Sequence, residues 1–407
     1  MKNLKQVFGG NLQQYTMVLA LVLLAVIFHV ISDGKMLTPS NAQALLAGNA
    51  YVLVLAIGMV MVIVIGHIDL SVGSVAAFVG MTVAISTSQM GLPWWVGLLV
   101  GMLVGTLIGA WHGFWLAKMG IPGFITTLAG MMVFRGLTIW VSKSISVPAP
   151  REFAFFGAGY LPEWGPNLGL NNSTLLLGII AAAWFVWSEF RRRTAILARG
   201  HELPMWVTLT RVILFLVVIG YLTWLFGSGR PGTSFPVPGL ILVALVIIYT
   251  VITQRTRFGR HIYAVGGNRQ AAALSGVNVS KVYFLVMANM SFLAALAGIL
   301  FIGRTGAAGP NDGTMWELDA IASVFIGGAA VSGGIGTVVG SMIGGLVMAV
   351  LNSGLILMGV GADQTQVIKG LVLLAAVAID VANKKQGGSS IFKRKPAAAK
   401  PAITVSQ

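Results

Sequence analysis

The polar residues best suited to chemistry lie between two apolar runs, in the stretch Gly66-His67-Ile68-Asp69-Leu70-Ser71-Val72-Gly73-Ser74. His67 and Asp69 are residue types that bind metals or relay protons, but two residues do not complete a metal site, and the sequence offers no obvious third ligand. Asp69, Ser71 and Ser74 are also helix-starting residues, because their oxygens accept hydrogen bonds from unpaired backbone N–H groups. The stretch therefore predicts a capped helix break, with pathway lining as the alternative and a metal site as the least favoured reading.

Further polar residues interrupt the apolar runs later in the chain. Glu317 and Asp319 are carboxylates in one such run, and Asn289 lies in the run before it. Charged groups inside a membrane are costly, so a role for them is expected. The candidates for a translocation pathway or a helix break are Asp69, Ser71, Asn289, Glu317 and Asp319. No paired catalytic Asp, Ser/His or metal constellation is apparent, so no catalytic or metal-binding residue is predicted and an intramembrane enzyme is disfavoured.

The glycine-rich segment 327–336 has the composition of a phosphate-binding loop, but it lacks the Gly-Lys-Ser/Thr ending of one. No Lys or Arg lies between Arg304 and Lys369. We therefore expect no nucleotide and no other cofactor on this chain.

Membrane helices must position these residues. Charged residues make up 9% of the 407 residues, apolar residues 57%, and the mean hydropathy is +0.88. A soluble domain carries about 25% charged residues, so a soluble enzyme and a disordered chain are both excluded. The net charge of +15 falls in short clusters between apolar runs, which is typical of topology signals rather than of nucleic-acid binding. The absence of cysteine excludes disulfides and thiol chemistry.

The apolar runs predict an all-α polytopic membrane protein with about 12 transmembrane or re-entrant helices. The first run lacks a small-residue cleavage pattern, so it is expected to be an uncleaved span. The third and tenth spans are short and interrupted by glycine, which is typical of broken or re-entrant helices. The predicted spans are 15–31, 42–65, 71–88, 93–117, 123–141, 173–190, 207–226, 237–253, 281–302, 316–331, 335–356 and 365–381.

The basic residues predict the orientation of these spans. Twelve passes with both termini in the cytoplasm place most of the 26 Lys and Arg residues on the inside, including those of the expected inside segment 191–206. The basic residues expected outside are Lys35, Lys143, Arg151, Arg230 and Arg304.

Glycines recur every four residues in two parts of the chain, and one offset relates them. A shift of 239 superposes Gly97, Gly101 and Gly105 on Gly336, Gly340 and Gly344. Units of about 45–141 and 281–381 are an odd number of passes apart, which predicts an inverted internal repeat. Glycines four apart share one helix face, where they allow close helix packing. The predicted packing glycines are Gly97, Gly101, Gly105, Gly109, Gly113, Gly336, Gly340 and Gly344.

Segment 254–280 is the longest basic stretch expected on the cytoplasmic side. Within it, Asn268 is a predicted N-cap, Arg269 to Ser275 are mostly good helix formers, and Gly276 is a predicted stop. A short capped helix between two spans is suited to docking a cytosolic partner. The residues predicted for this contact are Asn268, Arg269, Ala271, Ala272, Leu274, Ser275 and Gly276.

The pattern Thr256-x-x-Gly259-Arg260…Ala264-x-Gly266-x-Asn268-x-x-Ala271-Ala272-x-x-Ser275-Gly276 closely resembles the corresponding loop of permease subunits of ribose/xylose/galactose-type monosaccharide importers of the ATP-binding-cassette superfamily. Three further blocks also resemble this family, and together the resemblance spans about 45–385. These blocks are 68–74, Thr127-Leu128-Ala129-Gly130…Arg135-Gly136 and Glu317-Leu318-Asp319-Ala320-Ile321-Ala322.

The resemblance implies a monosaccharide permease in a bacterial inner membrane, with 268–276 as the coupling helix. ATP and magnesium would be bound by a separate cytosolic ATPase. A periplasmic sugar-binding protein and a second, identical permease protomer would complete the assembly, within membrane lipid. The stretch 173–235 adds a span pair and is similar to the xylose and multiple-sugar permease branch, which favours xylose or a mixed pentose/hexose set.

We therefore expect one permease domain over 1–386 and a disordered cytoplasmic tail over 387–407, because the composition of the tail cannot bury a core. The alternative function is an ion-coupled secondary transporter of a small polar solute. In that case Asp69 and Asp319 would serve as carboxylates within the membrane.

Overall fold

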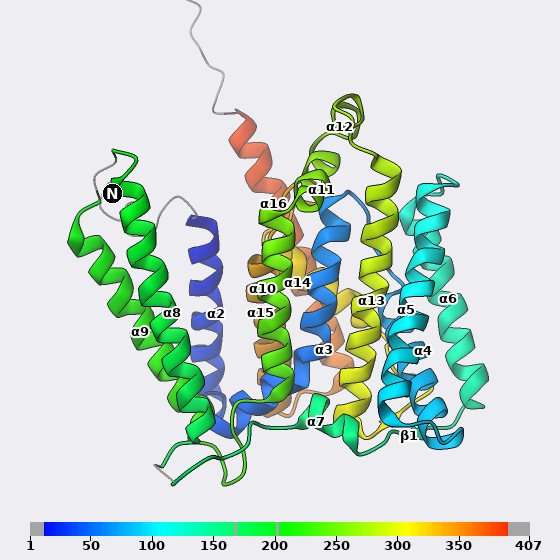
Figure 1. Ribbon diagram of the computed structural model, residues 1–407, viewed down its shortest axis with the longest axis horizontal. Coiled ribbons are helices and arrows are strands. Elements are labelled where there is room, and N and C mark those ends of the chain that lie inside the picture. Colours follow the sequence, from blue (N-terminus) through cyan, green and yellow to red (C-terminus); the bar gives the residue numbers. More distant parts are fainter. Residues whose placement is uncertain (1–11, 167–168, 201–202, 390–407) are drawn as a thin grey trace, which may run out of the picture.

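The computed structural model describes residues 12–166, 169–200 and 203–389, and almost all of its regular structure is helical. The helices form a bundle in which most of the long elements run side by side (Figure 1). In chain order the elements are α2 (Leu12–Ile31), α3 (Pro39–Val64), α4 (Val72–Ala84), the π-helical turn η1 (Ile85–Gln89), α5 (Trp94–Ala117), α6 (Gly123–Ser142), β1 (Val147–Pro148), α7 (Glu152–Ala158), α8 (Asn172–Leu197), α9 (Met205–Gly227), α10 (Val237–Arg255), α11 (Arg257–Gly267), α12 (Arg269–Leu274), α13 (Val279–Thr305), β2 (Ala307–Ala308), α14 (Trp316–Ile326), α15 (Val338–Leu357) and α16 (Ala362–Ser389).

Among the described residues, nine helices are long and apolar enough to cross a membrane. The predicted spans 15–31, 316–331 and 365–381 correspond to α2, α14 and α16, whose described residues are not among these nine. Helix α14 ends at Ile326 and has only 11 residues, because the glycine-rich segment that follows does not continue the helix. Across its described residues the structure therefore gives a multi-pass membrane protein with nine candidate spans, and the expected count of about 12 is not confirmed.

Helix α3 lies at the centre of the bundle. Its second half is apolar on every face, and a helix of this kind is stable only when it is surrounded by other helices. Val54, Leu55, Ala56 and Ile57 are fully buried. Helix α13 packs against α3, α4 and α5, and α15 packs against the other side of α3. These helices form the core on which the remaining elements are placed.

Helices α5 and α13 approach each other at backbone distance. A Cβ atom on Gly109 would lie 2.6 Å from Ala288 Cα and 2.7 Å from the Met287 carbonyl oxygen. Gly105 and Gly113 face the same helix, whereas Gly97 and Gly101 face η1 and α4. In the second predicted set, Gly340 and Gly344 lie against the end of α14, and Gly336 precedes α15. Apart from Gly336, these glycines therefore occupy positions where a neighbouring helix or its end leaves no room for a side chain.

The two ends of the bundle carry different elements (Figure 1). Helix α7 and the antiparallel pair β1–β2 lie at one end, which we call the α7 end. Helices α11 and α12, the described start of α2 and the described end of α16 lie at the other, the α12 end. Helix α16 continues to Ser389, three residues into the predicted tail 387–407, and residues 390–407 lie outside the described part.

Helices α8 and α9 form a hairpin at the edge of the bundle and correspond to the predicted extra span pair (Figure 1). Helix α8 continues to Leu197, so Arg191, Arg192 and Arg193, at the start of the expected inside segment 191–206, lie on the helix. The helix outlasts the predicted span 173–190 because arginine is a good helix former, and its charge alone does not end a helix.

Candidate functional site

Helix α12 is the short helix that the sequence predicts at the α12 end. The Asn268 side chain accepts a hydrogen bond from the Ala271 backbone N–H at 2.9 Å, which caps the helix. Gly276 follows with a φ of +84°, a backbone conformation that glycine adopts without strain. Both predicted caps are therefore confirmed.

The exposure of the α12 side chains corrects one expectation. The Leu274 side chain is 91% exposed, whereas Ala272 is 4% exposed. The Ala272 carbonyl accepts a hydrogen bond from Val277, where the chain turns back toward α13. Ala272 therefore packs inside the protein and does not face a partner. Of the predicted contact residues, those that are exposed are Asn268, Arg269, Ala271, Leu274, Ser275 and Gly276.

Helix α11 was not predicted from the sequence. It begins after Thr256, whose hydroxyl oxygen accepts a hydrogen bond from the Gly259 N–H at 3.1 Å. Ile262 and Val265 are buried on one face, while most of the basic residues are exposed. The capping threonine and these two apolar residues three positions apart are the signal that could have revealed it. Segment 254–280 is therefore largely two successive helices rather than one helix in a loop.

Three segments meet directly beneath α11 and α12. The Tyr263 hydroxyl of α11 donates to the Gly336 carbonyl at 2.7 Å. The Gly334 backbone N–H donates to the Val64 carbonyl, at the end of α3, at 2.8 Å. A Cβ on Gly266 would overlap that same carbonyl oxygen. We call this set, Val64, Tyr263, Gly266, Gly334 and Gly336, the glycine junction. It joins α11 to the break after α3 and to the break between α14 and α15.

A second chain of contacts leads from α12 to the break before α4. The Arg269 guanidinium lies 5.6 Å from the centre of the Tyr283 ring, and this ring meets the His67 ring edge-on at 4.8 Å. His67 in turn lies against Gly123 at the start of α6. Burial, together with the nearby Arg269 charge, lowers the pKa of His67, so its imidazole is neutral at neutral pH.

Asp69 and Ser71 lie at the start of α4 and form a local hydrogen-bonded pair. Asp69 is fully buried, and its Oδ1 accepts hydrogen bonds from the Ser71 backbone N–H at 2.8 Å and from the Ser71 hydroxyl at 2.6 Å. The predicted capping role therefore holds for Asp69. It does not hold for Ser71 and Ser74, whose hydroxyls donate and do not accept, since Ser74 donates to the Ser71 carbonyl. Asp69 Oδ2 has no hydrogen-bond partner among the described residues.

The other candidate residues face three different neighbours. Glu317 is 5% exposed and lies against Gly73 of α4, close enough to Asp69 and Arg135 for their charges to act on it. Asp319, on the same helix, instead accepts from Lys369 Nζ of α16 at 3.1 Å. Asn289 Oδ1 accepts from the Tyr249 hydroxyl of α10 at 2.6 Å. The structure therefore brings Asp69 and Glu317 into one neighbourhood, where the Asp319 charge also acts on Glu317, whereas Asn289 pairs with α10.

Two polar cavities at the α7 end were not predicted. One of about 270 Å³ is lined by Asn49, Tyr51, Arg304, Asn352 and Ser353, among others. Its neighbour, of about 480 Å³, includes Lys35, Gln43, Tyr160 and Arg230, and the two share Asn41, Ala44 and Leu357. Their amides, hydroxyls and cations can hydrogen-bond a polyhydroxylated solute. The lining residues come from separate helices and loops and form no sequence motif. Within the described residues, no three His, Cys, Asp or Glu side chains gather to hold a metal.

Comparisons with known proteins place this architecture in a family. Residues 41–377 match the family model described as branched-chain amino acid transport system / permease component. The xylose transport system permease protein of Haemophilus influenzae is 37% identical over 92% of this chain and 98% of its own length. The corresponding Escherichia coli protein is 36% identical over 92% and 93%. The ribose import permease protein of Bacillus subtilis is 31% identical over 92% and 94%.

No solved structure matches the chain. The family match covers most of the described bundle, from the start of α3 into α16. The chain is therefore a multi-pass membrane permease, and it belongs to the family of transport-system permease components that includes these xylose and ribose permeases.

Proposed function

We propose that this chain is the transmembrane subunit of an ATP-binding-cassette importer for a monosaccharide, either xylose or a mixed pentose/hexose set. The observation that carries the proposal is the similarity to the Haemophilus influenzae xylose permease, which covers 98% of that protein. The polar cavities at the α7 end support it, since they offer hydrogen-bonding groups of the kind that recognise sugar hydroxyls.

The proposed partners occupy opposite ends of the bundle. A cytosolic ATPase, which carries ATP and magnesium, docks on the exposed face of α12. A periplasmic sugar-binding protein delivers the sugar at the α7 end, and a second copy of the chain completes the permease. The α12 end is cytoplasmic in this proposal, because the basic residues of α11 and of the end of α8 lie there. Both chain termini then face the cytoplasm of a bacterium, and the protein lies in its inner membrane.

We further propose that α3–α6 and α13–α16 are the two halves of an inverted repeat, which with α2 and α8–α10 make twelve passes. Packing supports this pairing. Helix α5 packs on α4 of its own half and on α13, the first helix of the other half. Helix α15 likewise packs on α14 of its own half and on α3, the first helix of the other. Such repeats place a transport pathway where the two halves meet.

The contacts at the α12 end provide a route for coupling. Movement of α12 by the ATPase is transmitted through Arg269, Tyr283 and His67 to the break before α4. The glycine junction transmits it to the break between α14 and α15. Since α4 and α14 touch where Glu317 lies against Gly73, both halves can respond to one docking event.

Leu274→Glu tests the docking surface. The change places a charge on an exposed side chain, so membrane insertion and folding should remain intact. Sugar-stimulated ATP hydrolysis by the reconstituted complex should fall about tenfold or more, because a buried unpaired charge weakens an interface strongly. The matched control is Leu197→Glu, which makes the same change on an exposed residue at the end of α8, away from α12.

The same measurement separates the proposal from ion-coupled transport. Uptake and ATP hydrolysis are measured side by side in vesicles. If Leu274→Glu leaves both at the level of the Leu197→Glu control, the docking surface is wrong. If sugar uptake proceeds from an ion gradient without ATP, the importer assignment itself is overturned.

A further inference from the structure

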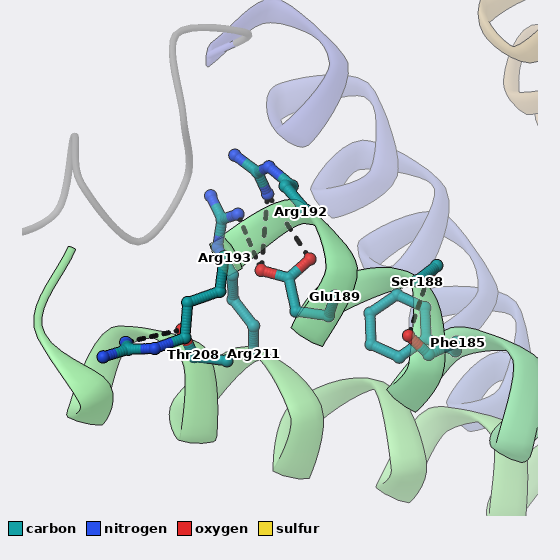
Figure 2. Close-up of polar contacts among 7 residues, drawn as sticks. All are labelled: Phe185, Ser188, Glu189, Arg192, Arg193, Thr208 and Arg211. Carbon is teal, nitrogen blue, oxygen red and sulfur yellow. Dashed lines mark hydrogen bonds and ion pairs between the residues drawn. The ribbon is translucent and has the colours of Figure 1, made fainter. Parts of the chain in front are cut away.

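The α12 end of the α8–α9 hairpin carries an excess of positive charge. Residues 189–211 contain five arginines and two glutamates, a net charge of +3 with histidine neutral. Figure 2 shows Arg192 and Arg211 on the single carboxylate of Glu189, at the end of α8 and the beginning of α9, with the Arg193 side chain directed toward Thr208. Arg211 lies about two turns inside α9, so this cluster extends from the helix end into the membrane span.

The Glu189 carboxylate organises the cluster. It is 7% exposed, and its Oε1 lies 3.2 Å from Arg211 Nη1 and 3.4 Å from Arg192 Nη1. One buried carboxylate is thus shared between two guanidinium groups. The excess of Lys and Arg in cytoplasmic loops explains exposed arginines. It requires neither a buried carboxylate nor an arginine within the span.

Arg191, Arg192 and Arg193 are held in place while they keep unused N–H donors. Arg193 Nη1 donates to the Leu203 carbonyl at 2.8 Å, and the Arg191 guanidinium lies 4.9 Å from the centre of the Trp187 ring. The Arg192 side chain is 46% exposed. Each guanidinium has five N–H donors, and these contacts use a small part of them. Fixed arginines with free donors are suited to bidentate recognition of a phosphate.

The surroundings of the cluster are those of a membrane interface. Trp184, Trp187 and Trp206 are exposed on the same two helices near the arginines, and tryptophan gathers at the boundary between headgroups and hydrocarbon. Farther along α9, Ile213 and Val217 are exposed apolar residues of a candidate membrane span. A ligand at this position therefore meets arginines at one end and an apolar helix surface at the other.

We propose that the α12 end of the hairpin binds the phosphate of an anionic phospholipid, with Arg191 and Arg192 as the exposed contacts and Glu189 and Arg211 as the buried support. An anionic lipid combines the negative headgroup and the acyl chains that this surface matches. The site gives the added span pair a role, since a bound lipid would fasten a peripheral hairpin to the membrane around it. This inference is independent of which sugar the permease moves.

The test uses the full chain, purified in a neutral detergent, and its thermal unfolding temperature. Phosphatidylglycerol should raise this temperature in a saturable way. Phosphatidylcholine and inorganic phosphate at the same phosphate concentration should not. The double variant Arg191→Gln/Arg192→Gln should require about 30-fold more phosphatidylglycerol for the same shift, because each arginine near an anionic surface contributes severalfold to binding.

The matched control is Arg151→Gln, an exposed arginine just before α7 at the opposite end of the bundle, which should respond to phosphatidylglycerol as the parent protein does. An undiminished shift in the double variant, or equal shifts with phosphatidylcholine, would overturn the proposal. Equal shifts with inorganic phosphate would show a site for soluble anions, which also overturns it. If the double variant does not fold, the parent protein still decides, since the phosphatidylglycerol shift must weaken with rising salt.

Discussion

The α5–α13 contact and the α8–α9 hairpin hold pairs of membrane helices together by opposite means. In the apolar stretch of α13, 67% of the residues are buried, and the glycines of α5 bring the two backbones into direct contact. In the apolar stretch of α8, only 11% of the residues are buried. This helix meets α9 through large side chains, such as the stacked rings of Phe185 and Phe215, whose centres lie 4.4 Å apart. The first contact depends on the absence of side chains, whereas the second depends on their presence.

This difference predicts where the protein tolerates change. Apolar association in a membrane gains little from excluding water, so close packing and polar contacts supply the attraction. A helix contact formed at glycine leaves no space for an added side chain, because that side chain must displace a backbone. A contact built on exposed apolar side chains can exchange one lipid-facing group for another.

The largest effect should come from Gly109→Leu. Its side chain would meet the backbone of Ala288 and Met287, which cannot move aside. We expect about a tenfold loss of monodisperse protein, measured by size-exclusion chromatography after membrane extraction. Gly220→Leu on α9 is the matched control, because nothing lies within 4 Å of a Cβ there. Equal losses in the two variants would remove the distinction between the contacts.

The next effect should come from Arg211→Met in the hairpin. Among the described residues, removing this guanidinium leaves the buried Glu189 with the partly exposed Arg192, and breaking a buried ion pair costs about 3–5 kcal/mol. Because the chain lacks cysteine, one cysteine introduced into α8 and one into α9 can be cross-linked when the two helices are close. This cross-linking should fall in Arg211→Met, because the two helices separate. The double variant Glu189→Met/Arg211→Met should restore cross-linking. Restoration would fail if the pair served only to set topology.

The smallest effect should come from Tyr263→Phe at the glycine junction. The change removes one hydrogen bond, to the Gly336 carbonyl, which contributes about 1 kcal/mol. The thermal unfolding temperature should therefore fall by only a few degrees. The rate of sugar-stimulated ATP hydrolysis should fall by a larger factor than this small loss of stability explains. Tyr221→Phe, on an exposed hairpin residue, is the control. A parallel small shift in both variants would show that the Tyr263 bond does not contribute to coupling.

Local signals in the sequence were sufficient for the features that neighbouring residues determine. Asn268 and Gly276 cap α12 as predicted, and Asp69 accepts from a backbone N–H two residues away. These contacts form within a few residues, so residue type and spacing specify them.

Features that depend on packing were not predictable in the same way. The burial of Ala272 follows from how the chain turns back toward α13 after α12. The separation of Glu317 and Asp319 onto different neighbours follows from the packing of α14 between α4 and α16. The cavities at the α7 end combine residues far apart in sequence, such as Asn49, Arg304 and Asn352, which no spacing rule relates.

The bond between the Gly334 N–H and the Val64 carbonyl has a consequence for sequence change. The bond joins two main-chain atoms, so it is lost through changes of the backbone. Proline at position 334 removes the donor, and any other side chain strains a position whose φ is +75°. The break between α14 and α15 is therefore tied to the end of α3 only as long as residue 334 remains glycine. Side chains that line the cavities can diversify over many generations, whereas this one backbone position is constrained to the residue that has no side chain.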